Sequence, residues 1–421
     1  MDSPYFEIVK SEIEADKGAY SCKNTIKFIP FPLKEKDIYH CKDFEDNLPK
    51  CPFCGAMFNG YNIESEKGMY CVICCRFYDN NFKRNNAMLN NVFEYNVFSN
   101  SQSNSAFTRT EIIIISQSLL KTHPCIIEAI KMYTKRSSLL DVYAIGIIGD
   151  CISFLQFCNR SSIITFPDGI GDYPVKKLFT GAIFVNALLE HSYPHLVSMP
   201  NLSASHQSNE ILSILTEFTK RQNANIHIIC NYGDFSGIVQ KNDDIFRLAY
   251  NGVRVSVSLI SDFLIPNQSV IPLVYITGGC FEQYLSQNTK EITDGLFRFM
   301  NTALLHDVQL NVYSLSPFKE IVGQGIVVSK KSSRLGKIER GKAIYLSFDI
   351  NYRTNLYIQF IVYYKSSFSS SKAKVITIHL ENQTFTNDMY QYEYTRELSL
   401  YKEAIGLENQ KEKDEQYQQS I

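Results

Sequence analysis

The chain has 421 residues, enough for two or three domains, and 45% of them are hydrophobic, so each domain can bury a core. The formal net charge of −1 argues against a chain-wide nucleic-acid-binding surface and confines any basic surface to a local patch. The first residues, "MDSPYFEIVKSEIEADK", lack the apolar core of a signal peptide, and no apolar run reaches the length of a membrane span, so we expect a cytoplasmic chain with reduced thiols.

Residues 1–45 are predicted to form an extended segment that joins a β-sandwich. Short apolar stretches such as "NTIKFIPFPL" occur here, and Pro30 and Pro32 restrict this part to an extended or edge-strand conformation.

Residues 46–82 contain the strongest motif of the sequence. Cys51, Cys54, Cys71 and Cys74 form the pattern C-x2-C-x16-C-x2-C, which is typical of a four-thiolate zinc site. Zn²⁺ prefers four soft ligands in a tetrahedron, and a closed sulfur shell leaves no position for substrate, so we predict one structural zinc ion. A reducing compartment disfavours disulfides, and a redox dithiol would need a helix start that this Gly-punctuated segment lacks. Cys75 remains an alternative to Cys74 as the fourth ligand.

Residues 83–110 are rich in Asn and Ser and are predicted to be a linker. From 111 to 315, β-branched strands alternate with amphipathic helices, which predicts a parallel sheet covered by helices on both faces. The predicted strands are 111–116, 141–150, 225–231 and 253–261, and the predicted helices are 122–136, 208–222, 243–251 and 289–307.

Residues 316–385 change to a period of two, which indicates antiparallel strands of a sandwich. Residues 386–421 are predicted to be a helix, with apolar side chains at helical spacing up to about residue 405, followed by a disordered polar tail. The expected fold class is therefore α/β plus β: a four-Cys finger, a trunk with a central parallel sheet, a β-sandwich and a short C-terminal helix.

Two further stretches raise functional questions. "SKKSSRLGKIERGK" is a candidate membrane-facing basic surface, although a solvated hairpin is the plainer explanation; its basic residues are Lys330, Lys331, Arg334, Lys337, Arg340 and Lys342, and Lys372 and Lys374 are candidates to extend it. The sequence has no nucleophile elbow, P-loop or paired-His motif, so we expect a non-enzyme with no catalytic residues.

The order of these parts resembles the inner-coat family of the COPII vesicle coat, and it is closest to the Sec twenty-three branch. The resemblance rests on "PFPLKE", on "YITGGCFEQYLSQNTKEITDGLFRFM" and on "YIQFIVYYKSSFSSSKAKVITIHLENQT", and it covers about residues 5–405. It implies that 111–315 is a von Willebrand A-like trunk. Such a domain often holds Mg²⁺ through Asp-x-Ser-x-Ser, but Ile114 stands at the Asp position before Ser116 and Ser118, so we expect no metal there.

The resemblance implies a structural coat subunit that binds the Sar GTPase, a paralogous coat subunit and anionic membrane at the endoplasmic reticulum, in transport to the Golgi. The family's helical and gelsolin-like domains, with the arginine that enters the Sar active site, have no counterpart in these 421 residues, so a GTPase-activating role is not assigned to any residue. The C-x2-C spacing of the first pair is more typical of the Sec twenty-four branch, a cargo adaptor. A second alternative is a transcription or repair subunit that combines an A domain with zinc ribbons, although those chains place the ribbon after the A domain.

Overall fold

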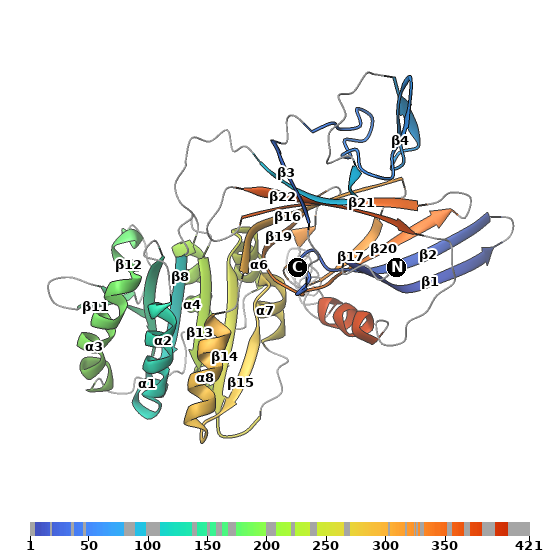
Figure 1. Cartoon of the computed structure of the whole chain (residues 1–421). Helices are drawn as coiled ribbons and strands as arrows, with labels where there is room; N and C mark the ends of the chain where they lie inside the picture. The colour runs from blue at the N-terminus through green and yellow to red at the C-terminus, as the bar shows by residue number, and fades with distance from the viewer. Residues whose placement is uncertain are drawn as a thin grey trace, which may run out of the picture. The chain divides into compact units, whose positions relative to one another are not determined.

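The structure is a computed structural model of the whole chain (Figure 1), and its parts fall into two compact units, Met1–Asn104 with Leu304–Tyr401 and Ser105–Ala303 with Lys402–Ile421. The structure describes residues 5–16, 19–34, 38–44, 48–79, 89–97, 110–136, 141–149, 152–156, 162–166, 174–198, 208–219, 224–235, 242–264, 270–301, 304–315, 318–323, 325, 327–328, 332–351, 356–365, 371–380 and 392–402.

The first unit contains a β-sandwich built from both ends of the chain. One sheet has the strand order β1-β2-β20-β17: Phe6–Asp16, Ala19–Phe28, Ile344–Asn351 and Phe318–Val322. The other has the order β18-β19-β16-β21-β22-β7-β3: Val327–Val328, Ser332–Glu339, Leu304–Ser314, Leu356–Lys365, Lys372–Leu380, Val92–Asn96 and Tyr39–Phe44. Only the β3–β7 pair of the second sheet is parallel among the pairings that the described residues make.

The core of the sandwich forms where the two sheets face each other. Phe28 of β2 stacks on Phe360 of β21 with ring centroids 4.0 Å apart, and Leu346 and Phe348 of β20 pack into the same cluster. These residues alternate along their strands because successive strand side chains point to opposite faces. The period of two in the sequence therefore reports the buried face of each sheet.

A helix at 392–402 lies against the four-stranded sheet. Its side chains Tyr394, Leu398 and Tyr401 pack around Tyr345 of β20, and Lys27 of β2 contacts Glu393 at 2.6 Å. Their spacing of three or four residues places them on one side of a helix. This helix confirms the expected short C-terminal helix; residues 403–421, the predicted tail, lie outside the described residues.

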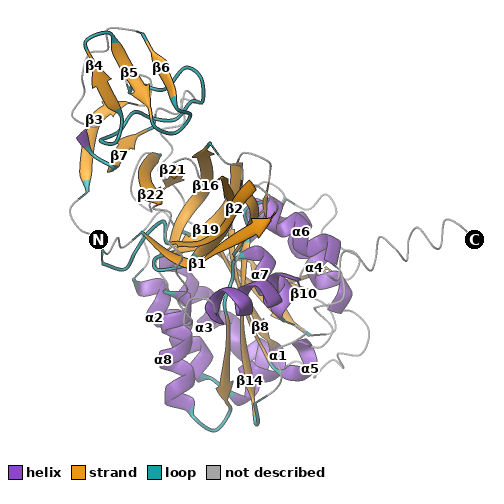
Figure 2. Cartoon of the chain, turned by 90° about the vertical axis from the view of Figure 1, so that its right-hand side faces the viewer, coloured by secondary structure: helices purple, strands orange, loops and turns teal. Residues whose placement is uncertain are grey.

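The second unit is an α/β domain around one sheet (Figure 2) with the order β11-β10-β9-β8-β13-β14-β15, to which β12 adds beside β9. The four strands β8, β9, β13 and β14 were expected from their β-branched runs, and β15 joins them in parallel. The bounds of the sheet's strands are Ser162–Phe166, Ile152–Gln156, Val142–Ile148, Thr110–Ser116, Ala224–Cys230, Arg254–Ser261, Phe281–Leu285 and, for β12, Thr180–Gly181.

Helices cover both faces of this sheet. The helices α1, α2, α3 and α8 share one apolar cluster with β8 and β9, whereas α6 contacts both α4 and α7 on the other side (Figure 1). Their bounds are Gln117–Thr122, Cys125–Lys135, Ala182–Ser198, Thr289–Met300, Ser208–Thr219, Asn242–Tyr250 and Ile271–Thr277, and α5 is Tyr232–Phe235. The central parallel sheet of the predicted fold class is thus confirmed. In the described part of the chain, no helix is long and apolar enough to cross a membrane.

Three sequence-based expectations need correction. The predicted linker 83–110 contains β7, which pairs with β22 and β3 and buries Phe93 and Tyr95. The trunk ends earlier than 315, because β16 starts at Leu304 and belongs to the sandwich, and α8 ends at Met300 rather than 307. The trunk sheet is not wholly parallel either, because the chain turns back after β9 into the antiparallel hairpin β10–β11.

Candidate metal centre

The four predicted cysteines lie on two similar turns of a small ribbon. The ribbon's strands are β4 (Ile63–Ser65), β5 (Gly68–Cys71) and β6 (Arg76–Tyr78), and they form a three-stranded sheet. In the first turn the Gly55 N–H donates to the Cys51 carbonyl at 2.8 Å, and in the second the Cys75 N–H donates to the Cys71 carbonyl at 2.8 Å. Each turn thus brings both cysteines of a pair to one side.

The fifth residue of each turn has a left-handed backbone. Gly55 has φ +79°, a region that glycine enters without a steric penalty, and Cys75 has φ 57° at the equivalent place. The Cys75 side chain is exposed and its Sγ points toward the Val72 carbonyl at 3.9 Å. Cys75 therefore closes the turn, and Cys74 contributes the fourth sulfur of the cluster.

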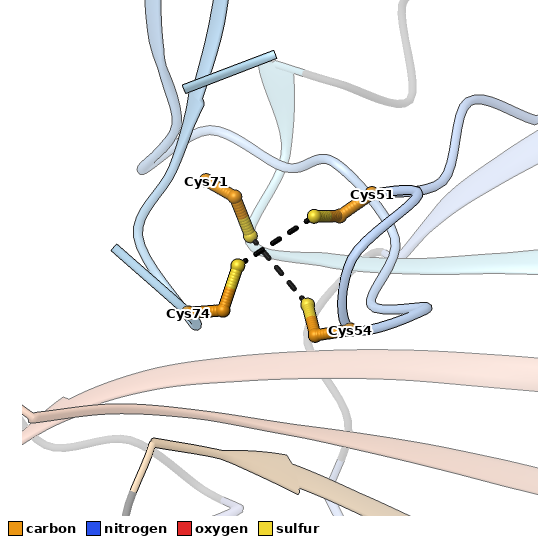
Figure 3. Close-up of side chains that lie close together, drawn as sticks. All are labelled: Cys51, Cys54, Cys71 and Cys74. Carbon is orange, nitrogen blue, oxygen red and sulfur yellow. Dashed lines mark hydrogen bonds between the residues drawn. The ribbon is translucent and has the colours of Figure 1, made fainter. Parts of the chain in front are cut away.

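The four sulfurs converge on one point (Figure 3). All four Sγ atoms lie within 4.8 Å of one another, with Cys51–Cys74 at 3.6 Å and Cys54–Cys71 at 3.8 Å. A tetrahedral site with Zn–S bonds of about 2.3 Å has sulfur–sulfur edges of about 3.8 Å, whereas a disulfide bond needs about 2.05 Å. The donor set and its spacing suit a tetrahedral, thiolate-bound metal ion and do not suit two disulfides.

Crowding of the thiols affects their ionisation. The pKa of Cys71 is raised, first by its hydrogen bond with the Cys54 thiol and then by burial. Burial, followed by repulsion from Cys71, raises the pKa of Cys74 to about 11. Because a neighbouring cation favours thiolates, a divalent ion at the centre would reverse both effects, as metal ligation requires.

The ribbon is attached to the seven-stranded sheet through a buried amide. Gln359 of β21 accepts from the Met57 N–H at 2.7 Å, donates to the Met57 carbonyl at 2.8 Å and donates to the Thr377 hydroxyl at 3.0 Å. Tyr61 of the ribbon packs on Tyr357, also of β21, with ring centroids 5.2 Å apart. Gln359 belongs to the quoted motif "YIQFIVYYK", but no role was predicted for it, although one polar residue inside an apolar strand was an available signal.

The candidate basic surface is not brought together as expected. Lys337 is buried, and Lys374 lies 99% buried with its ammonium 4.6 Å from the centre of the Phe31 ring, so neither can reach a lipid headgroup. Lys372 pairs with Glu94 at 3.0 Å. Arg340 is exposed and Lys342 half-buried, whereas Lys330, Lys331 and the Arg334 side chain lie outside the described residues. Contact of its ammonium with the Phe31 ring stabilises the buried Lys374 cation.

The carboxyl edge of the trunk sheet has neutral side chains at the place where an A domain can hold Mg²⁺. Ile114 is buried in β8 and has no oxygen to offer an ion. The Ser116 and Ser118 hydroxyls lie 2.8 Å apart, and the Asn231 amide donates to Ser118 at 2.6 Å. These three polar groups therefore satisfy one another.

Comparison with known proteins identifies the fold. No protein-family model and no curated protein matches the sequence. Among solved structures, the human COPII-coat protein Sec24c is similar, with a TM-score of 0.70 and 13% identity over 92% of this chain and 62% of that chain. The chain thus spans 62% of the length of the Sec24c structure, and at this identity the likeness shows a shared fold alone.

Two proteins built on the von Willebrand A fold are more distant. One is a von Willebrand factor type A protein from Catenulispora acidiphila, with a TM-score of 0.44 and 8% identity over 91% of this chain and 74% of its own. The other is the ArnB paralog VWA2 from Sulfolobus acidocaldarius, with a TM-score of 0.43 and 10% identity over 96% of this chain and 81% of its own.

Proposed function

We propose that the chain is a structural, non-enzymatic subunit of a COPII-type vesicle coat. It binds the membrane-bound Sar GTPase and a paralogous coat subunit at the endoplasmic reticulum and acts in transport to the Golgi. One Zn²⁺ held by Cys51, Cys54, Cys71 and Cys74 stabilises the ribbon. Contact with the membrane is peripheral and electrostatic, and nucleic acid is not a ligand.

One observation carries this proposal: the order in which the chain builds its parts. The four-Cys ribbon lies between β3 and β7 of the sandwich, and the whole α/β unit lies between β7 and β16. Two successive insertions into one sandwich are a specific feature of a chain path. The likeness to Sec24c extends over 92% of this chain. The transcription or repair alternative, in which the ribbon follows the A domain, does not have this order.

The branch within the coat family is a second question. The Sec twenty-three branch is supported by the sequence motifs that include "YIQFIVYYKSSFSSSKAKVITIHLENQT". The cargo-adaptor branch is supported by the C-x2-C spacing of Cys51 and Cys54 and is the alternative to test. A direct contact with the Sar GTPase distinguishes the two, since we expect it from a chain of the first kind.

The test is recruitment by the Sar GTPase on liposomes. The full chain, with and without a candidate paralogous subunit, is incubated with Sar loaded with a non-hydrolysable GTP analogue or with GDP, on neutral or anionic vesicles. We expect flotation that requires the GTP form and increases with anionic lipid, because surface charge attracts cationic segments. Recruitment only through the paralogous subunit would support the cargo-adaptor branch. Equal recovery with GDP, or none with both proteins present, would contradict the coat proposal.

A further inference from the structure

The helices α4 and α6 of the α/β unit enclose a groove that the proposed function does not use. Its volume is about 300 Å³, at the lower end of the range for ligand pockets, which suits one side chain better than a cofactor. The lining residues recur at three- and four-residue spacing, so each helix presents one side to the groove. They are Ser213, Thr216 and Glu217 from α4, and Asp244, Arg247, Tyr250 and Asn251 at α6 and its end.

The most informative of these groups is the carboxylate of Asp244. Its side chain is only 8% exposed, yet its one ion pair among the described residues is to Arg247 at 3.8 Å, beyond hydrogen-bonding distance. A buried carboxylate normally accepts several hydrogen bonds, because the loss of water is otherwise costly. The position of Asp244 in the first turn of α6 favours its negative charge through the helix dipole, and Arg247 is the one cation that lines the groove with it.

The remaining groups of the groove set the sign and shape of a ligand. The lining contains two carboxylates, those of Asp244 and Glu217, and one guanidinium, that of Arg247, so its formal charge is negative. Arg247 is 68% exposed and can therefore turn into solvent without leaving a buried charge. Tyr250 lines the same groove and is 59% exposed, so its aromatic ring is accessible to a cation bound there.

We propose that this groove binds the side chain of an arginine or lysine from a partner protein. The cationic head pairs with Asp244 in place of Arg247, the stem lies along the groove between α4 and α6, and Tyr250 packs against it. This inference is independent of the coat proposal, because it rests only on groups of the α/β unit.

The test measures binding of short labelled peptides to the full chain by fluorescence anisotropy. The probes are a Gly/Ser hexapeptide with one central arginine, the same peptide with citrulline, which is neutral and nearly isosteric, and the same peptide with glutamate. We expect the arginine peptide to bind at least about ten-fold more tightly than the citrulline peptide, and the glutamate peptide not to bind, because only the first pairs with a buried carboxylate.

Variants then assign the site. Asp244→Asn should weaken the arginine peptide about ten-fold or more, whereas Asp294→Asn, which removes an exposed charge on α8, should leave it unchanged. Arg247→Gln should tighten binding several-fold, because it removes the internal competitor from an exposed position. This variant also keeps the test informative if Asp244→Asn fails to fold, which thermal unfolding by circular dichroism will reveal.

The remaining outcomes are equally decisive. Displacement of the peptide by agmatine at equal affinity would support the cation site and identify a free small cation as sufficient. Equal binding of arginine and citrulline peptides, tighter binding of the glutamate peptide, loss of binding in Arg247→Gln, or no binding at millimolar peptide would each overturn the proposal.

Discussion

At the scale of single residues, the sequence predicts the metal centre well and its attachment poorly. The spacing of Cys51, Cys54, Cys71 and Cys74 is a local pattern, and a local pattern can be read from one sequence. The choice between Cys74 and Cys75 as the fourth ligand required the backbone conformation. Cys75 occupies the left-handed position that Gly55 holds in the other turn. The basic surface was predicted less well than the metal centre. The side of the strand on which Lys337 lies depends on strand register, and composition does not determine register.

Gln359 allows a direct test of the attachment. Gln359→Leu removes both hydrogen bonds to the Met57 backbone. The Met57 N–H loses its partner and the carbonyl keeps the Asn59 amide at 3.3 Å, so we expect the free energy of unfolding of the sandwich unit to fall by about 2 kcal/mol. Urea unfolding measures the loss, and hydrogen exchange should show faster exchange at the Met57 amide.

The matched control is Gln309→Leu. Gln309 lies exposed on β16, and within the described ranges its side chain bonds only to Asn311, so its replacement should change stability by no more than about 0.5 kcal/mol. An equal loss in both variants, or unchanged exchange at Met57 in Gln359→Leu, would show that the amide does not hold the ribbon.

At the scale of secondary-structure elements, prediction succeeded where hydrophobic runs are long. The segment "EIIIIS" became the central strand β8 because a strand buried on both faces must be apolar throughout. Strand β7 was missed because it is only five residues long and lies in an Asn- and Ser-rich segment. The segment becomes a strand by pairing with β22, about 280 residues later in the chain. Short-range sequence patterns carry no information about such a distant partner.

The two central strands β8 and β13 share a buried polar group. Glu111 of β8 accepts from the Asn225 amide at 2.7 Å and contacts His227 Nε2 at 2.9 Å, both on β13. The His227 ring meets Tyr133 of α2 and Phe299 of α8 edge-on, at 6.3 and 6.0 Å between ring centroids. This network therefore links two strands and two helices of the α/β unit.

Removal of Glu111 should weaken the α/β unit strongly. Glu111→Leu leaves the Asn225 and His227 groups buried without their acceptor, so we expect a loss of about 3–5 kcal/mol in the free energy of unfolding. Glu128→Leu, at an exposed position of α2, is the control and should change it by about 0.5 kcal/mol or less. Urea denaturation of both proteins compares them. A loss below about 1 kcal/mol for Glu111→Leu would mean that the network is unimportant for stability.

At the scale of the whole molecule, the chain has two units that we expect to respond separately to the metal. We expect the purified protein to contain about one zinc per chain and Cys51→Ser with Cys71→Ser to contain none. The double variant should lower the unfolding temperature of the sandwich unit by about 10 °C, because metal binding contributes to folding of the ribbon, and leave the α/β transition in place.

The control for this experiment is Cys75→Ser. Cys75 is exposed and outside the sulfur cluster, so the variant should keep its zinc and its stability. Metal analysis and calorimetry provide the measurements. Zinc lost equally from Cys75→Ser, or iron in place of zinc, would contradict the assignment of the site.

The order of parts was the most useful global signal in the sequence, and the fold agrees with it. The order of parts does not show which strands pair across the inserted units. Each strand's partner, parallel or antiparallel, is fixed only when the whole sandwich has formed. Thus the predicted linker and the trunk's end were both misplaced at β7 and β16, the two strands that flank the α/β insertion.

The interrupted sandwich also has a consequence for synthesis on the ribosome. Thr25 of β2 contacts Ser347 of β20, a residue 322 positions later. Strand β7 likewise pairs with β22, which is synthesised after helix α8 of the α/β unit. The segment Ser105–Ala303 of the α/β unit emerges while β2 and β7 still lack their later partners β20 and β22. Because domains generally fold as they leave the ribosome, the nascent chain must carry unpaired strand edges for most of its translation, a period when a chaperone would have the most to protect.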